Sequence, residues 1–237
     1  MAKRATKRQT RTRPTPASGR PPDRTGMTLT PRSAPYAWVT WLTGLIAGED
    51  HCAWAAWLKA HYQYRRRPID NPDALSRWMA THDALVMARV NTLTVDGWAV
   101  SVEDQNALTV HGEAATIGGK PDIVAARDDR LLIVDAKGGR AKHKYIWQVR
   151  VYLALLPLQW PERCAGKQLV GHVEYPDEIV DVTLAPGDAQ RIYETIKMVG
   201  GPEPPTTPSA RGCKYCDIAE CPDRWAETLT TTAEKTP

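Results

Sequence analysis

The chain has 237 residues, of which 42% are hydrophobic and 24% are charged, and it contains only five cysteines. These proportions are those of an ordinary globular protein, and they exclude the collagen-like, fully disordered and disulfide-scaffold classes. The formal charge is +4, but nine of the 31 basic residues and only one acid lie before Pro35. This distribution predicts a basic tail on a slightly acidic body and suggests an acidic partner for the tail.

Residues 1–35 are rich in Thr, Pro, Arg and Lys and have almost no apolar side chains. We therefore expect a disordered tail, which is either a solvated solubility segment or a nonspecific contact for a polyanion. No apolar segment follows its charges, and the most apolar stretch, residues 36–47, is shorter than the ~20 residues of a membrane helix. We expect a cytoplasmic protein, in which cysteines serve as ligands or catalysts more often than as disulfides.

Two short helices are predicted after the tail, within residues 36–70. Apolar side chains recur at helical spacing between residues 38 and 62, and Gly44 and Gly48 indicate a break between the helices. This segment also contains Cys52, far from the other cysteines.

A long amphipathic helix is predicted to begin at Asn71-Pro72-Asp73, where a capping residue is followed by proline at the first helical position. Apolar residues continue at helical spacing as far as Leu93, and His82 lies on the apolar face. A histidine in such a stripe is either a hydrogen-bonded core residue or a ligand, and the spacing alone leaves both open.

Strands and helices alternate in the rest of the chain. Runs with strand character, separated by Gly-rich or acidic turns, occupy residues 98–102, 107–111, 122–126, 131–135, 169–175 and 179–184. Helical spacing returns over residues 145–156, where Pro157 is expected to end the helix, and over residues 187–199. This order predicts one mixed α/β domain over residues 71–200, with helices packed on a central sheet.

The segment after this domain is predicted to be an appendage. A stiff, Pro-rich linker over residues 201–210 leads to a cysteine-containing segment over residues 211–226. Residues 227–237 are expected to form a second disordered tail.

The strongest chemical pattern is a pair of aspartates, each next to an apolar strand. Asp122 follows Gly119-Lys120-Pro121, and Asp135 ends the run of residues 131–135. If the chain turns at Asp128-Asp129, antiparallel pairing sets Asp122 opposite Asp135, with their Cβ atoms ~5 Å apart. A longer or bulged turn would shift this pairing and turn one carboxylate to the other face. Because opposed like charges destabilise a sheet, the pairing favours a divalent cation with oxygen ligands between them.

Lys137 would share the face of Asp135, because side chains alternate along a strand. Two carboxylates, a metal ion and a lysine suit phosphodiester hydrolysis, since the ion activates water and neutralises the phosphate while the lysine orients the nucleophile or stabilises charge. The alternative is that Asp-x-Lys arises by chance in a chain with 24% charged residues. The place of Asp135 at the end of an apolar strand, opposite a second aspartate, favours the functional interpretation.

Three motifs in this order resemble the PD-(D/E)XK nuclease superfamily, specifically its RecB-like branch. They are Gly-Lys-Pro-Asp122, Asp135-Ala-Lys137 and Gln148-Val-Arg-Val-Tyr152. The resemblance implies a restriction-endonuclease-like α/β core with a mixed central sheet. It also implies Mg²⁺ or Mn²⁺ at Asp122, Asp135 and His82, which matches a histidine that this branch carries on a preceding helix. Where relatives have a glycine about one turn before that histidine, this chain has Trp78 and Met79.

The resemblance also gives a role to Gln148 and Tyr152. They are four residues apart and therefore share one helix face. As members of the motif they would act with Asp122, Asp135 and Lys137 in catalysis, by holding the DNA backbone or by positioning the lysine. The alternative, from the residues alone, is that they are simply a pair at the boundary of the core, and the upstream motif favours the functional interpretation.

Several further polar residues are candidates for accessory roles. Lys142, His143 and Lys144 stand just before the helix of Gln148, where they would contact phosphates or form a solvated first turn. Glu113 resembles an accessory acid of some relatives.

Three cysteines cluster as C-x2-C-x4-C at Cys213, Cys216 and Cys221. Three neighbouring thiolates need a fourth ligand to complete a tetrahedral or cubane metal site, and Cys52 or else Cys164 would supply it. Buried structural thiols are the alternative, but a polar, Pro-flanked segment favours metal binding. The spacing alone does not separate zinc from a [4Fe-4S] cluster.

The order of the cysteines resembles that of the iron-sulfur RecB-like nucleases, including the CRISPR-associated ones and the AddB subunit type. One cysteine precedes the histidine and three follow the nuclease core; the last spacing is commonly x5 in relatives and is x4 here. The resemblance implies a [4Fe-4S] cluster, with Zn²⁺ as the alternative, at Cys52, Cys213, Cys216 and Cys221. Such a cluster would tie the N-terminal helices to the C-terminal segment.

The resemblance covers roughly residues 38–225 and implies a metal-dependent DNA exonuclease that acts on single-stranded ends in recombination, repair or CRISPR spacer acquisition. The sequence has no Gly-x4-Gly-Lys-Ser/Thr motif, so a helicase partner would supply unwinding, and a recombinase or CRISPR integrase is another expected partner. One alternative is a noncatalytic nucleic-acid-binding or adaptor protein, which a damaged aspartate or lysine would favour; both are intact. Another is a zinc-stabilised structural subunit.

Overall fold

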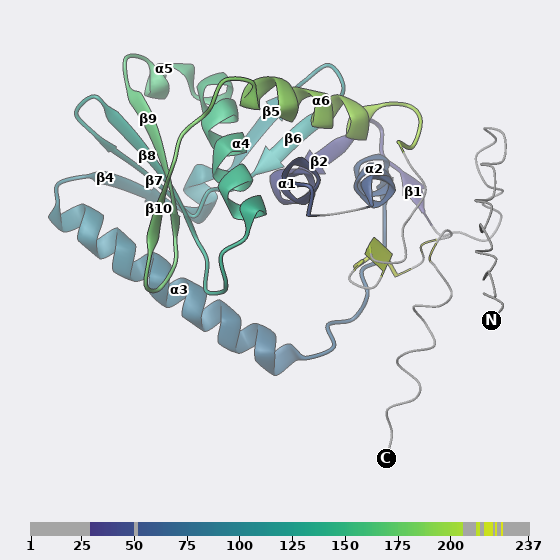
Figure 1. Cartoon of the computed structure of the whole chain (residues 1–237), viewed down its shortest axis with the longest axis horizontal. Coiled ribbons are helices and arrows are strands. Elements are labelled where there is room, and N and C mark those ends of the chain that lie inside the picture. Colours follow the sequence, from purple (N-terminus) through teal and green to yellow (C-terminus); the bar gives the residue numbers. More distant parts are fainter. Residues whose placement is uncertain are drawn as a thin grey trace, which may run out of the picture.

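The computed structural model describes residues 29–49, 52–205, 212–213, 216–219, 221 and 224 (Figure 1). Residues 1–28 of the tail predicted over residues 1–35, the predicted tail over residues 227–237 and the second half of the predicted linker lie outside the described residues. The elements in chain order are β1 (Thr30–Pro31), β2 (Tyr36–Trp38), α1 (Val39–Ala47), α2 (Ala53–His61), β3 (Tyr62–Gln63), α3 (Pro72–Val95), β4 (Ala99–Val102), η1 (Glu103–Asn106), β5 (Leu108–His111), β6 (Thr116–Gly119), β7 (Ile123–Arg127), β8 (Arg130–Ala136), α4 (His143–Gln159), α5 (Pro161–Cys164), β9 (Gln168–Glu174), β10 (Ile179–Val182) and α6 (Asp188–Gly200). None of the described helices combines the length and apolar character that crossing a membrane requires.

A five-stranded sheet in the order β10-β9-β8-β7-β4 forms the centre of the fold. Strand β8 pairs with β9 in parallel and with β7 in antiparallel orientation, so the sheet is mixed. A three-stranded sheet has the order β2-β6-β5, with β2 and β6 parallel. The prediction of a mixed α/β fold with helices around a central sheet is confirmed.

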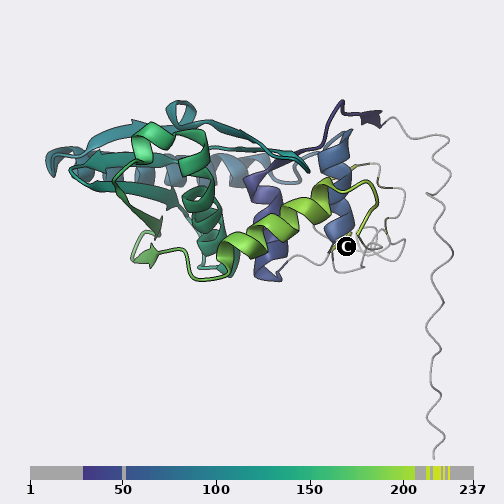
Figure 2. The same ribbon diagram turned by 90° about the horizontal axis from the view of Figure 1, so that it is seen from above.

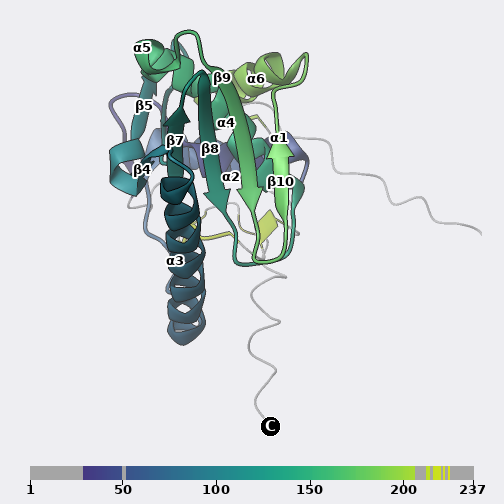
Figure 3. The same ribbon diagram turned by 90° about the vertical axis from the view of Figure 1, so that its left-hand side faces the viewer.

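Different helices cover the two faces of the five-stranded sheet, with α3 in front of it and α4 behind it in Figure 3. On the α3 face, Val86 and Leu93 of the helix belong to the same buried cluster as Ile123 and Val134 of the strands. On the other face, Val149 of α4 belongs to the main core. Every residue of β8 after Arg130 is buried, because the strand packs on both faces.

Helix α3 begins as the sequence predicts and then extends along the sheet. The side chain of Asn71 accepts a hydrogen bond of 2.9 Å from the backbone N–H of Ala74, and Pro72 occupies the first helical turn. The second half of the helix packs on the strands, whereas most of its first half is exposed and extends past the end of the sheet (Figure 3).

The remaining helices extend the α4 layer. Helix α1 packs against α4, and α6 crosses α1 and α2 (Figure 2). The break predicted at two glycines occurs at Gly48, which ends α1 in the left-handed conformation with φ of +73°, whereas Gly44 is buried inside the helix.

Helix α4 continues through Pro157 to Gln159, so the prediction that Pro157 ends it is wrong. Leu155 and Leu156 are buried in the core, and the N–H of Trp160 closes the last turn on the carbonyl of Leu156 at 2.8 Å. This packing offsets the cost of a proline inside a helix, which is ~3 kcal/mol.

Residues 29–35, at the end of the predicted tail, take part in the fold. Strand β1 pairs with β3, and the N–H of Arg32 donates to the carbonyl of His61 at 2.8 Å. These short contacts attach the start of the described chain to the end of α2.

Candidate active site

The β7–β8 hairpin brings Asp122 and Asp135 together. Its register pairs Ile123 with Val134 and continues to the two-residue turn at Asp128-Asp129, where Asp128 has a φ of +51°. One residue beyond the Ile123–Val134 pair, away from the turn, the same register sets Asp122 opposite Asp135. The turn and the register predicted from the sequence are confirmed.

The carboxylate of Asp135 is buried, with 1% of its side chain exposed, and contacts an ammonium group. Its Oδ2 lies 2.6 Å from Nζ of Lys137 in an ion pair, and it has no hydrogen bond to any other group among the described residues. Burial raises the pKa of Asp135 to about 6, although Lys137 acts in the opposite direction. Burial alone would lower the pKa of Lys137, but attraction to Asp135 raises it. The pair therefore keeps its lysine charged at neutral pH.

Asp122 joins the hairpin to α3 through His82. Nε2 of His82 lies 3.2 Å from Oδ2 of Asp122, and the same oxygen accepts a hydrogen bond of 2.7 Å from the backbone N–H of Ala136. The hydrogen bond with Asp122 raises the pKa of His82, and burial only partly opposes this shift. The histidine singled out on α3 thus contacts one of the two aspartates.

Gln148 and Tyr152 lie side by side on α4, and both are buried. Nε2 of Gln148 donates to Oδ1 of Asp135 at 2.8 Å, and the Tyr152 hydroxyl accepts from the backbone N–H of Lys120 at 3.4 Å. Burial raises the pKa of Tyr152, so its hydroxyl is protonated at neutral pH. Within the described structure these side chains pack on the hairpin that carries Asp122 and Asp135, on the side of α4, and do not project into solvent.

The lysines before α4 gather around one aromatic ring. Nζ atoms of Lys137, Lys142 and Lys144 lie 5.0, 5.9 and 5.8 Å from the ring centroid of Tyr145. His143, between two of these lysines, is exposed. The candidate phosphate contacts therefore border the ammonium that contacts Asp135.

Glu113, the candidate accessory acid, lies at the opposite end of strand β6 from Asp122. It is exposed in the turn between β5 and β6, where the N–H of Gly112 donates to the carbonyl of Ala115 at 3.1 Å. Strand β6 then runs from this turn toward Asp122, so Glu113 lies at its far end.

The donor atoms near Lys137 suit a hard divalent cation. Two carboxylates and an imidazole are ligands that Mg²⁺ and Mn²⁺ accept, and Oδ2 of Asp135 has only the ammonium of Lys137 as a partner among the described residues. Among the described residues, however, no group of three or more His, Cys, Asp and Glu side chains is arranged to hold a metal ion. The donor atoms therefore fit Mg²⁺ or Mn²⁺ in their chemistry. In this structure, His82 contacts Asp122 and Lys137 contacts Asp135 directly.

The cysteines fall into two parts of the fold. Cys52, Cys216 and Cys221 pack against one buried cluster, whose members are Trp54, Trp57, Leu58 and Ile218. Cys213 is buried, and its carbonyl accepts a hydrogen bond of 3.3 Å from the N–H of Cys216. Cys164, at the end of α5, belongs to the main core instead.

The segment that carries three of these cysteines is attached to the N-terminal helices. Ile218 forms an antiparallel bridge with Arg66, and Oδ1 of Asp217 lies 2.5 Å from Nζ of Lys59. Nη1 of Arg224 donates to the carbonyl of Cys213 at 2.9 Å. These contacts bring a distant part of the chain beside Cys52.

The sequence-based reasoning missed an ion pair that lies next to the site. Nε of Arg89 on α3 lies 3.0 Å from Oε2 of Glu174 at the end of β9, and their side chains are 15% and 11% exposed. In the parallel register, Glu174 pairs with Ala136 of β8. A signal was available, because Glu174, like Asp135, is a carboxylate that ends an apolar strand.

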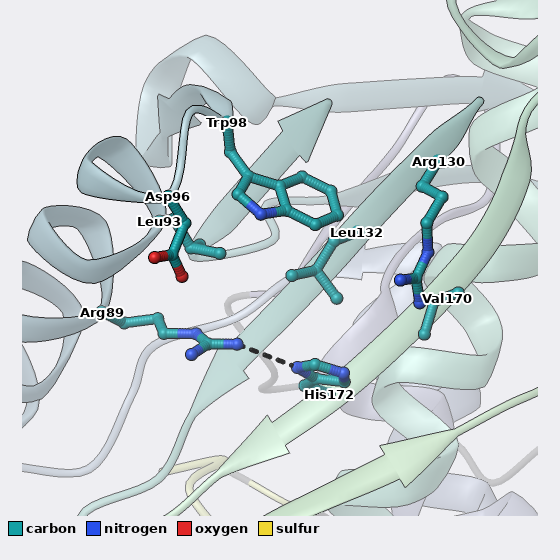
Figure 4. Close-up of a pocket in the computed structure, with 8 residues that line it drawn as sticks. All are labelled: Arg89, Leu93, Asp96, Trp98, Arg130, Leu132, Val170 and His172. Carbon is teal, nitrogen blue, oxygen red and sulfur yellow. Dashed lines mark hydrogen bonds between the residues drawn. The ribbon is translucent and has the colours of Figure 1, made fainter. Parts of the chain in front are cut away.

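Arg89 also lines a pocket of about 130 Å³ between α3 and strands β8 and β9 (Figure 4). Nη2 of Arg89 lies 3.2 Å from Nδ1 of His172, whose Nε2 lies 3.1 Å from Oδ1 of Asp181. Burial lowers the pKa of His172, and Arg89 acts in the same direction despite Asp181. The described lining contains none of the site residues predicted from the sequence.

One of three comparisons with known proteins identifies a family. A family model described as the PD-(D/E)XK nuclease superfamily matches residues 44–221, which is more than half of the chain. No curated protein matches the chain. Solved structures do match, and one of them, titled "Crystal structure of SSO0001", has a TM-score of 0.42 and 15% sequence identity over 82% of this chain and 90% of that chain.

Proposed function

Because the chain belongs to the PD-(D/E)XK nuclease superfamily, which indicates a nuclease, we propose that it is a divalent-metal-dependent DNA exonuclease that hydrolyses phosphodiester bonds at single-stranded ends. The observation that carries this proposal is the buried carboxylate of Asp135, opposite Asp122 and 2.6 Å from the ammonium of Lys137. A carboxylate pair next to a charged lysine is suited to the hydrolysis of a phosphodiester.

We assign Mg²⁺ or Mn²⁺ to Asp122, Asp135 and His82, whose oxygen and nitrogen atoms fit these ions. Bound there, the ion would supply activation of water and neutralisation of phosphate charge. Binding requires the imidazole of His82 to be neutral, although its contact with Asp122 now favours the protonated form.

Lys137 is the catalytic cation of this proposal. Its Nζ is held by Asp135, and the backbone N–H of Lys137 donates to the carbonyl of Glu174 at 2.8 Å. A fixed ammonium at this position orients the attacking water or stabilises the charge that develops on the phosphate, without reorganising during the reaction. The attack is an in-line displacement by water, with no covalent intermediate.

Gln148 and Tyr152 are positioning residues in this scheme. Gln148 fixes Oδ1 of Asp135 at 2.8 Å, which leaves the other carboxylate oxygen directed at Lys137. Tyr152 fixes the backbone at Lys120, just before Asp122. Gln148 thus holds the end of β8, and Tyr152 holds the chain just before β7.

The likeness of the motifs to the RecB-like branch supports exonuclease action on single-stranded ends. It also supports a place in recombination, repair or CRISPR spacer acquisition, beside a helicase, recombinase or integrase. Lys142 and Lys144 would contact the DNA backbone, since both lie on the side of the site where Lys137 is found.

We further propose a [4Fe-4S] cluster, with Zn²⁺ as the alternative, at Cys52, Cys213, Cys216 and Cys221. The shared apolar surroundings of Cys52, Cys216 and Cys221 support this assignment. Anaerobically purified protein should be coloured, and Cys213→Ala should lose the visible absorbance. A colourless, zinc-loaded sample would contradict the iron-sulfur assignment.

Activity is tested by incubating the purified protein with end-labelled single-stranded DNA and Mn²⁺. We expect degradation by the wild type, and a loss of about 10²-fold or more for Asp135→Asn and Lys137→Ala. Circular single-stranded DNA should resist, because it has no ends. Exposed Lys197 on α6 gives a matched control, since Lys197→Ala should retain full activity.

Two outcomes would overturn the proposal. Equal degradation by the wild type and both site variants would point to a contaminating nuclease. A wild type that binds DNA but does not cleave it would favour a noncatalytic adaptor protein.

A further inference from the structure

Trp78 is a large aromatic side chain that packing leaves exposed. It is 48% exposed and lies in the first half of α3. Its ring stacks on that of His82, one helical turn later, with centroids 5.5 Å apart and planes inclined by 30°. The histidine covers part of the indole, and the rest of the ring faces solvent.

The indole also lies close to the loop after Lys137. A Cβ atom built on Gly138 would lie 3.9 Å from Nε1 of Trp78 and 3.5 Å from Cγ2 of Thr81. Trp78 is therefore between the imidazole that contacts Asp122 and the backbone that follows the catalytic lysine. An exposed aromatic ring at this position is beside the phosphate that the site would cleave.

Cations border this part of the site. Lys137, Lys142 and Lys144 lie around the ring of Tyr145 at the start of α4, and the exposed Arg77 precedes Trp78 in the sequence of α3. An aromatic face among cations is the combination that binds unpaired nucleic acid, because bases stack on rings while phosphates pair with positive charges.

We propose that Trp78 is a positioning residue that stacks on an unpaired nucleobase next to the scissile phosphate. This inference rests on the proposed function. An unpaired base can turn toward the indole, whereas a base inside a duplex already stacks on its neighbours. Trp78 would therefore select unpaired nucleotides without reading their sequence, since every base has a π face.

Binding of a fluorescent oligothymidylate, measured in EDTA so that nothing is cleaved, tests this role. Trp78→Ala should weaken binding roughly tenfold or more, and Trp78→Phe should retain most of the affinity. Met79→Ala is the matched control, because Met79 is 50% exposed on the same helix and should not change the affinity. Binding of a blunt duplex should be the same for the wild type and Trp78→Ala.

A single abasic nucleotide, moved along the oligonucleotide, separates stacking from a structural effect on His82. At one position the missing base should weaken binding to the wild type but not to Trp78→Ala, because the base and the ring form the same contact. If no position shows this coupling, or if Met79→Ala weakens binding as much as Trp78→Ala, the inference is wrong and the indole serves packing or a protein partner.

The same experiments distinguish this inference from the proposed function. A wild type that binds and cleaves the oligonucleotide without any coupling at Trp78 would overturn only the inference. A wild type that neither binds nor cleaves it would overturn both.

Discussion

The backbone N–H of Lys137 donates a hydrogen bond of 2.8 Å to the carbonyl oxygen of Glu174. The proposed catalytic lysine is therefore held by β9 as well as by its own strand. The side chain of Glu174 is paired in turn with Arg89 on α3. Helix α3 is thereby linked through Glu174 to the backbone of Lys137, although the ion pair between Arg89 and Glu174 does not belong to the candidate site itself.

Replacing Arg89 by leucine should destabilise the fold at neutral pH. The variant would leave the carboxylate of Glu174 largely buried and without its partner, which costs about 3 kcal/mol of unfolding free energy. Burial already raises the pKa of Glu174 and Arg89 opposes this shift, so removing Arg89 should raise it further. Protonation then removes the unpaired charge, and the deficit should shrink as the pH falls from about 7 to about 5. Urea unfolding at both pH values measures this.

The double variant Arg89→Leu/Glu174→Gln is the control for this prediction. It has no charge left at either of these two positions, so it should be more stable than Arg89→Leu at pH ~7 and show a smaller dependence on pH. Exposed Arg77→Leu should leave stability within about 0.5 kcal/mol of the wild type. A deficit for Arg89→Leu that stays the same at both pH values would contradict the explanation.

Replacing Gln148 by leucine should reduce turnover more than it reduces substrate binding. The variant removes the hydrogen bond to Oδ1 of Asp135 and leaves a buried carboxylate oxygen unsatisfied, at a cost of ~1–3 kcal/mol. We expect a roughly tenfold lower kcat on single-stranded DNA with little change in KM. Gln190→Leu on the exposed face of α6 is the control and should not alter either constant.

The affinity for Mn²⁺ should depend on pH around the pKa of Asp135. Burial raises this pKa to about 6, and the hydrogen bond with Asp122 raises the pKa of His82. Both groups bind a metal ion only when deprotonated, so the affinity should fall as the pH drops through about 6, by about tenfold per unit for each protonated ligand. Titration calorimetry of the DNA-free protein measures this directly.

The variant His82→Ala separates the protonation of Asp135 from that of His82 in the same calorimetric experiment. The variant should bind Mn²⁺ more weakly, yet its affinity should still fall below about pH 6, because Asp135 is unchanged. A constant affinity for the wild type between about pH 5 and pH 7 would rule out Asp135 as a ligand.

Deleting residues 1–28 should weaken DNA binding and reduce its dependence on salt. This deletion removes eight basic residues and keeps β1, which begins at Thr30. The slope of log affinity against log salt concentration should flatten by about 0.7 for each phosphate of single-stranded DNA that the tail neutralises in the full chain. Cleavage at saturating substrate should be unchanged, and an unaltered slope would make the tail a solubility segment.

The sequence was sufficient to predict the hairpin because one short turn determines its register. Once Asp128 and Asp129 turn the chain, the pairing of Asp122 with Asp135 follows from the antiparallel register, counted residue by residue from the turn. The helix that carries His82 was predicted from its cap and its apolar spacing. Local rules therefore gave the two elements that meet at the candidate metal ligands.

Strand β6 was missed for a physical reason that concerns distant residues. It ends in Gly118 and Gly119, which lack the side chains typical of strands. A Cβ atom at Gly118 would lie 1.8 Å from the hydroxyl of Tyr36, and one at Gly119 would lie 2.8 Å from Cε1 of Tyr152. The glycines are required by neighbours far away in the sequence, and strand propensity does not contain that information. The pairing of Arg89 with Glu174 escaped prediction for the same reason.

Helix α3 carries Trp78, His82 and Arg89, so a stacking surface, a candidate metal ligand and an anchor to the sheet belong to one rigid body. At 1.5 Å per residue, about 16 Å of helix separates Trp78 from Arg89. The buried residues of this helix, Val86 and Leu93, both follow His82 in the chain, so its C-terminal half is the anchored one. Because the helix fixes the spacing of Trp78 and His82, a substitution that loosens this anchor should disturb the proposed stacking residue and the proposed metal ligand together.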